Sequence, residues 1–202
     1  DYDNDGYVDL FFSGLESDNR LYRNMGNLVF SDITQESLKC INIFCTTSVS
    51  ADVNGDNWQD IVIGTIGKGV LFYINNQKGG FTPLTYDNTT KADSAIYGIA
   101  ISDLDNDNDL DLYVSTYRSD SIRNNKNIKF TFENVNGVNK IRGAVDVLNR
   151  KKYRYDRFYS NDKGNIFESG PTDYIIINDS NKKYKIVNTP KYFNNLKGDF
   201  DI

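Results

Sequence analysis

Three short stretches of the chain place acidic or amide side chains at every second position. They begin at Asp1 (DYDNDGYVD), at Asp52 (DVNGDNWQD) and at Asp103 (DLDNDNDLD), and successive stretches start 51 residues apart. Carboxylates crowded this closely repel one another, and a bound divalent cation turns that repulsion into coordination. Calcium takes about 6–8 oxygen ligands in a flexible geometry. The spacing therefore predicts three calcium loops that hold about three Ca²⁺ ions.

Each loop is numbered here from its first Asp, so that equivalent residues share a position. Side-chain oxygens at positions 1, 3, 5 and 9 and the main-chain carbonyl at position 7 form the predicted ligand set. Position 6 is Gly6, Asn57 or Asn108, residue types that tolerate the left-handed backbone of a tight turn. The predicted metal ligands are Asp1, Asp3, Asp5, Tyr7 and Asp9 in the first loop, Asp52, Asn54, Asp56, Trp58 and Asp60 in the second, and Asp103, Asp105, Asp107, Asp109 and Asp111 in the third.

Two other interpretations of these loops are weaker. An EF-hand requires a Glu at position 12 and a helix after the loop, whereas position 12 here is Phe12, Ile63 or Val114, inside an apolar segment typical of a strand. Asp and Asn also favour turns that bind nothing. Three loops in one register, each with an acidic residue at position 9, favour metal binding over simple turns.

The segments around the loops predict strands. In the second repeat, four short segments separated by turn residues read as strands: TTSVSA, DIVIGT, VLFYIN and FTPLTY. The run Ile61–Val62–Ile63 is apolar on both faces, as expected for a strand covered on both sides by other sheets. Four-stranded units repeated at about 40–50 residues are typical of propeller blades. We predict an all-β fold, a partial β-propeller of about three four-stranded blades with calcium-binding loops between strands.

The repeats start at residues 1, 52, 103 and about 199, where GDFDI supplies Asp199 and Asp201 as the start of a fourth loop. The third repeat is longer than the others, and we place an insertion at 118–172, after which blade strands resume at Asp173. Because propellers close with about 4–8 blades, the remaining blades of the same propeller are expected partners, and we expect the chain to be a piece of a longer protein.

The pattern D-x-D-x-D-G-x-x-D followed by an apolar strand resembles the FG-GAP/VCBS repeats of integrin-α-like β-propellers. The segment LYRNMGNLVFSDIT, residues 21–34, is similar to the blade-closing part of such repeats in cartilage-acidic-protein-like (ASPIC/UnbV-type) proteins. The Phe-Gly element of the family is replaced by Tyr97-Gly98. The resemblance covers residues 1–118 and 173–202 and implies that 1–202 is a propeller fragment. It implies an extracellular or cell-surface scaffold for adhesion or ligand binding, with an unidentified protein or glycan as ligand.

Composition excludes several functions. The chain has no histidine, which removes Ser-His-Asp triads, Cys-His pairs and His-ligated zinc. Its formal charge is −5, which argues against nucleic acid, and no 18-residue apolar stretch is present to span a membrane. Every close Asp cluster already has a metal-ligand explanation, so we predict no catalytic residues. The alternative is an accessory or catalytic propeller domain of a secreted enzyme, such as a polysaccharide lyase or a phospholipase.

Two further features leave alternatives open. Cys40 and Cys45 lie five residues apart, which permits either two free thiols, slightly favoured, or a disulfide if the chain turns between them. The stretch RKKYRYDRFY, residues 150–159, combines basic and aromatic side chains. Such a stretch can contact an anionic glycan or form a solvated hairpin face, and the second interpretation is favoured.

Overall fold

A computed structural model describes residues 1–86, 94–118, 127–148, 151–153, 158–160, 166–168, 171–179 and 183–188. In this part of the chain the regular structure is β, apart from one short 3₁₀ helix, η1 (Glu36–Lys39). The predicted all-β class is confirmed. Across the same residues no helix is long and apolar enough to cross a membrane. The chain divides into two compact units, one formed by Asp1–Tyr117 with Thr172–Ile202 and the other by Arg118–Pro171.

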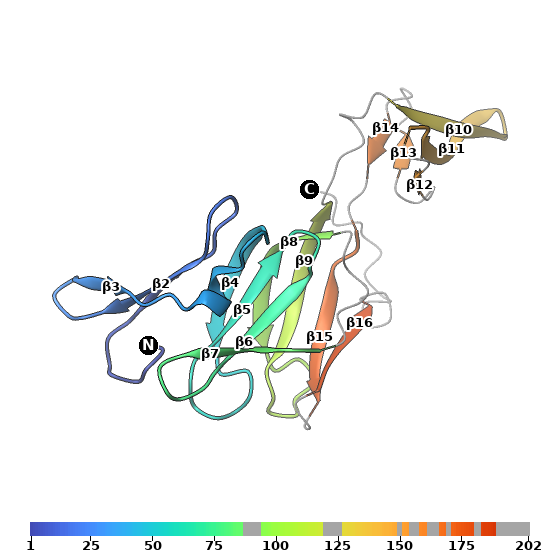
Figure 1. Ribbon diagram of the computed structural model, residues 1–202. Coiled ribbons are helices and arrows are strands. Elements are labelled where there is room, and N and C mark those ends of the chain that lie inside the picture. The colour runs from blue at the N-terminus through green and yellow to red at the C-terminus, as the bar shows by residue number, and fades with distance from the viewer. Residues whose placement is uncertain are drawn as a thin grey trace. The chain divides into compact units, whose positions relative to one another are not determined.

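The second repeat forms a complete four-stranded antiparallel sheet, called the second sheet. Its strands are β4 (Cys45–Ala51), β5 (Asp60–Thr65), β6 (Val70–Asn75) and β7 (Phe81–Leu84), in that order across the sheet (Figure 1). Every residue of β5 is buried. Along this strand Val62 packs towards the third repeat, while Ile61 and Ile63 pack towards the first. The prediction of a strand covered on both faces is confirmed, and it explains why β5 lacks polar alternation.

The third repeat forms a second four-stranded sheet, called the third sheet, in the order β16-β15-β9-β8. The strands are β8 (Ser94–Ser102), β9 (Asp111–Arg118), β15 (Tyr174–Asp179) and β16 (Lys183–Asn188). The chain leaves this sheet after β9 and returns at β15, whose residue Tyr174 pairs with Val114. The sheet is therefore assembled as in the second repeat, with its third strand supplied by a distant segment.

The second unit, Arg118–Pro171, lies in sequence between β9 and β15, where the sequence analysis placed its insertion. It contains a three-stranded sheet of β10 (Ile128–Val135), β11 (Val138–Asp146) and β12 (Lys151–Tyr153). A separate pair is formed by β13 (Phe158–Ser160) and β14 (Ile166–Glu168). Asn136 and Gly137 join β10 to β11 with φ of 53° and 85°, as the tight turn of a hairpin requires.

The first repeat forms a three-stranded sheet, called the first sheet, of β1 (Leu10–Phe12), β2 (Arg20–Asn24) and β3 (Phe30–Asp32). In the other two sheets a strand, β4 or β8, precedes the acidic loop. In the first repeat the described strands, β1, β2 and β3, all follow the loop, so three strands are found where the sequence predicted a four-stranded unit.

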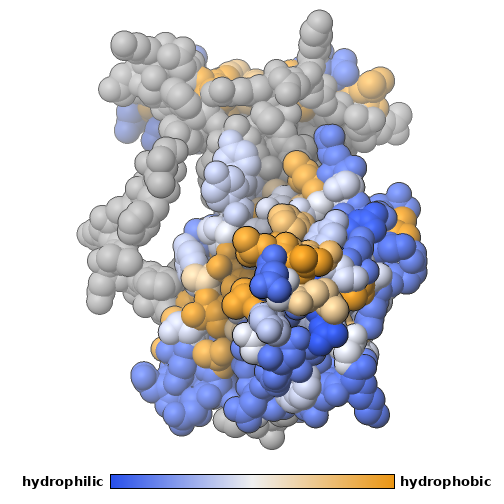
Figure 2. Space-filling model, turned by 90° about the vertical axis from the view of Figure 1, so that its left-hand side faces the viewer, coloured by the Kyte–Doolittle hydropathy of each residue, from blue (hydrophilic) through white to orange (hydrophobic). Residues whose placement is uncertain are grey.

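The two faces of the first sheet differ. Phe11 packs against a core that the first sheet shares with the second, while Leu10 and Phe12, on either side of it in β1, are exposed. Val8, Leu28 and Val29 of the same repeat are also exposed, at 70%, 85% and 58%. Figure 2 views the molecule from the side on which Figure 1 shows β2 and β3, and apolar residues gather on this surface. The first sheet thus has one covered face and one uncovered apolar face.

Two cores hold the first unit together, one between the first and second sheets and one between the second and third. In the latter, the ring of Phe72 on β6 lies 4.4 Å from that of Tyr184 on β16, centroid to centroid. At the same interface Gly64 of β5 faces Ile96 of β8. A β-carbon on Gly64 would lie 2.5 Å from Cγ2 of Ile96 and 2.6 Å from Cγ2 of Thr47, so only glycine fits between these sheets.

We therefore expect Gly64→Ala to lower the free energy of unfolding by about 1–3 kcal/mol, because the added methyl group overpacks the interface between the second and third sheets. Urea denaturation measures the loss. Gly98→Ala is the matched control, because a β-carbon there meets only the Ser115 hydroxyl oxygen, at 3.0 Å. Equal stability of the two variants would contradict this view of the interface.

Candidate metal centres

The three predicted loops occupy equivalent places in the fold. The second loop joins β4 to β5, the third joins β8 to β9, and the first leads into β1. Figure 1 shows the second and third loops at the same end of their sheets. The first and second loops are neighbours, because the Asn4 side-chain amide lies within 3.5 Å of the Asn57 carbonyl oxygen. The loops thus line one edge of the first unit.

The same hydrogen bonds shape all three loops. The carboxylate at position 1 accepts from the main-chain N–H groups at positions 5 and 6, at 3.1 and 2.8 Å for Asp1, 3.0 and 2.7 Å for Asp52, and 3.2 and 3.1 Å for Asp103. The carboxylate at position 5 accepts from the N–H at position 7, at 2.9 Å in every loop. These bonds wrap each loop around its first carboxylate.

The backbone at position 6 is left-handed in every loop, with φ of 88° at Gly6, 66° at Asn57 and 72° at Asn108. The residue types at this position predicted that conformation. Position 4 is left-handed as well, at Asn4, Gly55 and Asn106, which the sequence analysis did not single out. Asn and Gly are the residues that adopt this conformation most readily, so the residue types at positions 4 and 6 allow the main chain of each loop to turn twice.

The carboxylate at position 9 is the most enclosed group of each loop. Asp60 and Asp111 are fully buried, and the side chain of Asp9 is 4% exposed. One of its oxygens accepts from the N–H at position 2, at 2.9 Å for Asp9, 3.0 Å for Asp60 and 2.8 Å for Asp111. The other accepts from the N–H of an asparagine on the strand that pairs with the one following the loop (β2, β6 or β15), at 2.8, 2.7 and 2.9 Å respectively. Position 9 therefore fastens the loop to the sheet.

The asparagines that meet position 9 are Asn24, Asn75 and Asn178, and the sequence analysis missed them. The side-chain amide of Asn75 donates to the carbonyl oxygen of Tyr2 at 2.7 Å, and that of Asn178 donates to the carbonyl oxygen of Val53 at 3.1 Å. Tyr2 and Val53 are position 2 of the preceding loop. Asn75 and Asn178 thus each join their own loop to the loop of the repeat before it. The signal in the sequence is an Asn that follows an apolar or aromatic strand segment in LYRN, FYIN and IIIN.

The predicted ligands converge in the first and third loops. Carboxylate oxygens of Asp1, Asp3 and Asp9 lie within 4.8 Å of one another, as do those of Asp103, Asp105 and Asp111. These are positions 1, 3 and 9 in both cases. The second loop carries an amide at position 3, and Asn54 donates from Nδ2 to Asp56 at 3.0 Å. Position 7 contributes its N–H to the turn, and the carbonyl ligand at Tyr7, Trp58 and Asp109 stays a prediction.

The electrostatics of the loops fit a divalent cation. Burial raises the pKa of Asp60 to about 6, helped by the charges of Asp56 and Asp52 and opposed by the N–H groups of Asn75 and Val53, which favour its charged form. Partial desolvation within the loop raises the pKa of Asp105 above its ordinary value, and so do the charges of Asp107 and Asp111. Such shifts mark carboxylates whose negative charge needs compensation. An all-oxygen donor set of this kind suits Ca²⁺.

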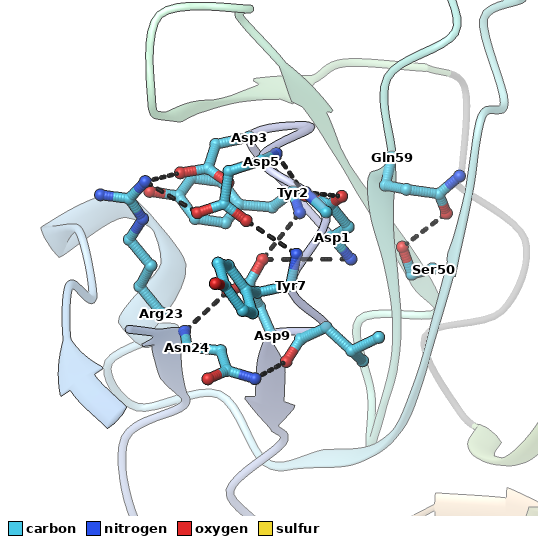
Figure 3. Close-up of polar contacts among 12 residues, drawn as sticks. Asp1, Tyr2, Asp3, Asp5, Tyr7, Asp9, Arg23, Asn24, Ser50 and Gln59 are labelled. Atoms are coloured by element: carbon cyan, nitrogen blue, oxygen red, sulfur yellow. Dashed lines mark hydrogen bonds and ion pairs between the residues drawn. The ribbon is translucent and has the colours of Figure 1, made fainter. Parts of the chain in front are cut away.

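The first loop differs from the others in its surroundings (Figure 3). Arg23 on β2 points at its carboxylates, with Nη2 placed 2.7 Å from Oδ2 of Asp3 and 2.9 Å from Oδ2 of Asp5. The second oxygen of Asp3, Oδ1, is buried and has no hydrogen-bond partner. A buried carboxylate oxygen without a donor is costly unless a cation meets it, and this observation supports the fit to a metal.

Other residues singled out in the sequence have the following places. Cys40 and Cys45 are buried free thiols, and Sγ of Cys40 lies 3.2 Å from the Tyr73 hydroxyl oxygen. Lys151 and Lys152 begin β12, while Arg150, Arg154 and Arg157 lie outside the described residues, so an anionic ligand for that stretch stays a prediction. Asp199 and Asp201 of the fourth loop also lie outside them.

We expect Asn75→Ala to lower the free energy of unfolding by about 1–3 kcal/mol, because the partly buried carbonyl groups of Tyr2 and Gln59 lose their donor. Thermal denaturation in the presence of a chelator measures the change without a contribution from metal. Asn24→Ala is the matched control, since its amide donates to Val8 within its own repeat at 3.0 Å. A cost for Asn24→Ala as large as that for Asn75→Ala would contradict a link between loops.

Comparison with known proteins adds one finding. The model of the FG-GAP-like repeat matches residues 1–63 and again residues 52–114. Each match begins at the first Asp of a loop and extends to position 12 of the next loop. No curated protein and no solved structure matches the chain. The two matches together, residues 1–114, therefore contain all three loops.

Proposed function

This chain belongs to the FG-GAP-like repeat family, and we propose that it is a calcium-stabilised β-propeller segment that serves as an adhesion or ligand-binding scaffold. FG-GAP-like repeats form propeller-type folds, and in this proposal the three sheets of the first unit are blades of the propeller. The observation that carries the proposal is the convergence of oxygens from positions 1, 3 and 9 inside one repeated loop. The more specific likeness to cartilage-acidic-protein-like proteins remains a resemblance in sequence.

Calcium would be held by the carboxylates at positions 1, 3, 5 and 9 and by the carbonyl at position 7. When bound, it supplies positive charge that neutralises the crowded carboxylates. The protein supplies the rest of the arrangement. Position 1 sets the loop backbone, and position 9 connects the site to β2, β6 or β15 through Asn24, Asn75 or Asn178. Filling a loop would therefore stiffen the blade and its joint with the preceding blade.

We place the protein outside the cell or at the cell surface, where FG-GAP repeats are typical. Partly exposed loops suit that location, because extracellular calcium modules work with dissociation constants of about 10⁻⁴–10⁻³ M. We propose that the scaffold binds a protein or a glycan. We propose no catalytic role for this chain, because its acidic clusters are accounted for as metal ligands and it contains no histidine.

We propose that another blade of the same propeller covers the exposed face of the first sheet. Leu10 and Phe12 are 39% and 55% exposed on that face, while the equivalent face of the second sheet is covered by the first. Asn75 and Asn178 each donate to a carbonyl oxygen of the preceding loop. By analogy, the side chain of Asn24 would donate to a loop of the covering blade. A protein that carries another repeat on this face would make Asn24→Ala as costly as Asn75→Ala.

The calcium proposal is tested by isothermal titration of the chelator-treated chain. We expect about three Ca²⁺ ions for the unmodified chain, about two for Asp105→Ala, and a higher melting temperature in calcium than in chelator. Asp105 is chosen because it converges on the third site while remaining exposed, so the fold tolerates its loss. Asp18→Ala, outside the loops, is the control and should keep three ions. An unchanged stoichiometry for Asp105→Ala would remove that loop from the proposal.

A further inference from the structure

Arg23 is a basic side chain that contacts the carboxylates of the first loop from the neighbouring strand β2. It precedes Asn24 at the end of β2, and its guanidinium contacts the carboxylates at positions 3 and 5 of the first loop (Figure 3). The residues that precede Asn75 and Asn178 are Ile74 and Ile177. The first loop is therefore the one of the three with an arginine at this strand position.

The contacts of Arg23 use oxygens that a cation needs. Nη2 binds Oδ2 of Asp3 and Oδ2 of Asp5, and both residues belong to the predicted ligand set. An oxygen that accepts from a guanidinium cannot turn fully towards a metal ion, and the fixed positive charge also repels a dication. The hydrogen bond that Arg23 donates to Asp5 and the charge of Asp3 raise the pKa of Arg23, so it keeps its charge at all physiological pH values.

The contact is also able to open. The side chains of Arg23, Asp3 and Asp5 are 36%, 17% and 26% exposed, so water reaches the pair and screens it. Partly exposed ion pairs are weak, and a long arginine side chain can move into solvent when a cation takes over the charge of the carboxylates that it leaves. The second oxygen of Asp3 remains in the loop without a hydrogen-bond partner. A cation therefore has a place to enter while the guanidinium leaves.

We propose that Arg23 is a built-in competitor for calcium, which makes the first loop the weakest and most concentration-dependent of the three sites. The inference rests on the proposed function, because it concerns regulation of the same loops. In low calcium the guanidinium neutralises Asp3 and Asp5 and holds the loop. In high calcium the ion displaces the guanidinium, and Arg23 becomes available at the surface. The second and third loops, with isoleucine at this position, fill first.

The test uses glycines as separate reporters in one sample. Gly6 lies in the first loop and Gly55 in the second, so the amide signals of [¹⁵N]glycine-labelled chain follow the two sites independently by NMR. During a calcium titration of the unmodified chain, the Gly55 signal should reach its midpoint at a lower concentration than the Gly6 signal. Arg23→Gln should lower the Gly6 midpoint roughly tenfold, the effect expected for two partly exposed ion pairs, and leave Gly55 unchanged.

The control is Arg20→Gln, which removes the same charge from the same strand but from a side chain that pairs with Asp32. It should leave the Gly6 midpoint within about twofold. Arg23→Lys retains the charge and loses the planar fork, and it should tighten the first site by less than Arg23→Gln.

The outcomes separate this inference from the function on which it rests. If Gly55 responds to calcium but Arg23→Gln leaves the Gly6 midpoint unchanged or raises it, the loops bind calcium and Arg23 is only a structural fastener, which overturns the inference. Equal tightening by Arg20→Gln would overturn it too, because the effect would then come from net charge. If neither glycine responds in the unmodified chain, the calcium proposal fails and this inference fails with it.

Discussion

The buried carboxylate at position 9 is the group on which the rest of the repeat depends. Asp60 receives N–H groups from Val53 in its own loop and from Asn75 on the third strand, and it is fully enclosed. Two main-chain donors stabilise its charge without neutralising it, because an N–H group is only a dipole. The same carboxylate therefore connects the loop to the sheet by hydrogen bonds, and its negative charge favours a bound cation. Asp9 and Asp111 repeat the arrangement.

Asparagine extends this arrangement from one repeat to the next. The main chain of Asn75 binds Asp60, and its side chain binds the carbonyl oxygen of Tyr2 in the preceding loop. The loops, the third strands and the joints between blades thus form one hydrogen-bonded series along the edge of the sheets. A cation held in the second loop would act on the preceding blade through these two hydrogen bonds. The metal loops, in this view, organise the propeller as well as each blade.

The sequence predicted the class of fold and the repeat because both have strong local signals. The acidic spacing identifies each loop, and Ile61–Val62–Ile63 identifies a strand that is buried on both faces. Positive φ at position 6 followed from Gly6, Asn57 and Asn108 for the same reason. The first sheet has three described strands, β1, β2 and β3, against the four predicted.

What the sequence did not predict depends on contacts between distant residues. Asn75 and Asn178 act across repeats, and Asn178 follows Asp111 by 67 residues because the second unit intervenes. Arg23 looks like an ordinary strand residue until β2 brings it beside Asp3 and Asp5. Gly64 is fixed by Ile96, which belongs to another sheet. Pattern and spacing report local backbone preferences, and these contacts arise only after the sheets have packed.

The central claim is that the crowded carboxylates of the three loops exist to surround a calcium ion. The most direct measurement is a crystal structure of the chain grown in excess Ca²⁺, with anomalous diffraction used to locate the ion. The account predicts an anomalous peak in each loop, about 2.3–2.6 Å from carboxylate oxygens at positions 1, 3 and 9. Loops that contain only water under these conditions, with the carboxylates held by the same N–H groups, would contradict it.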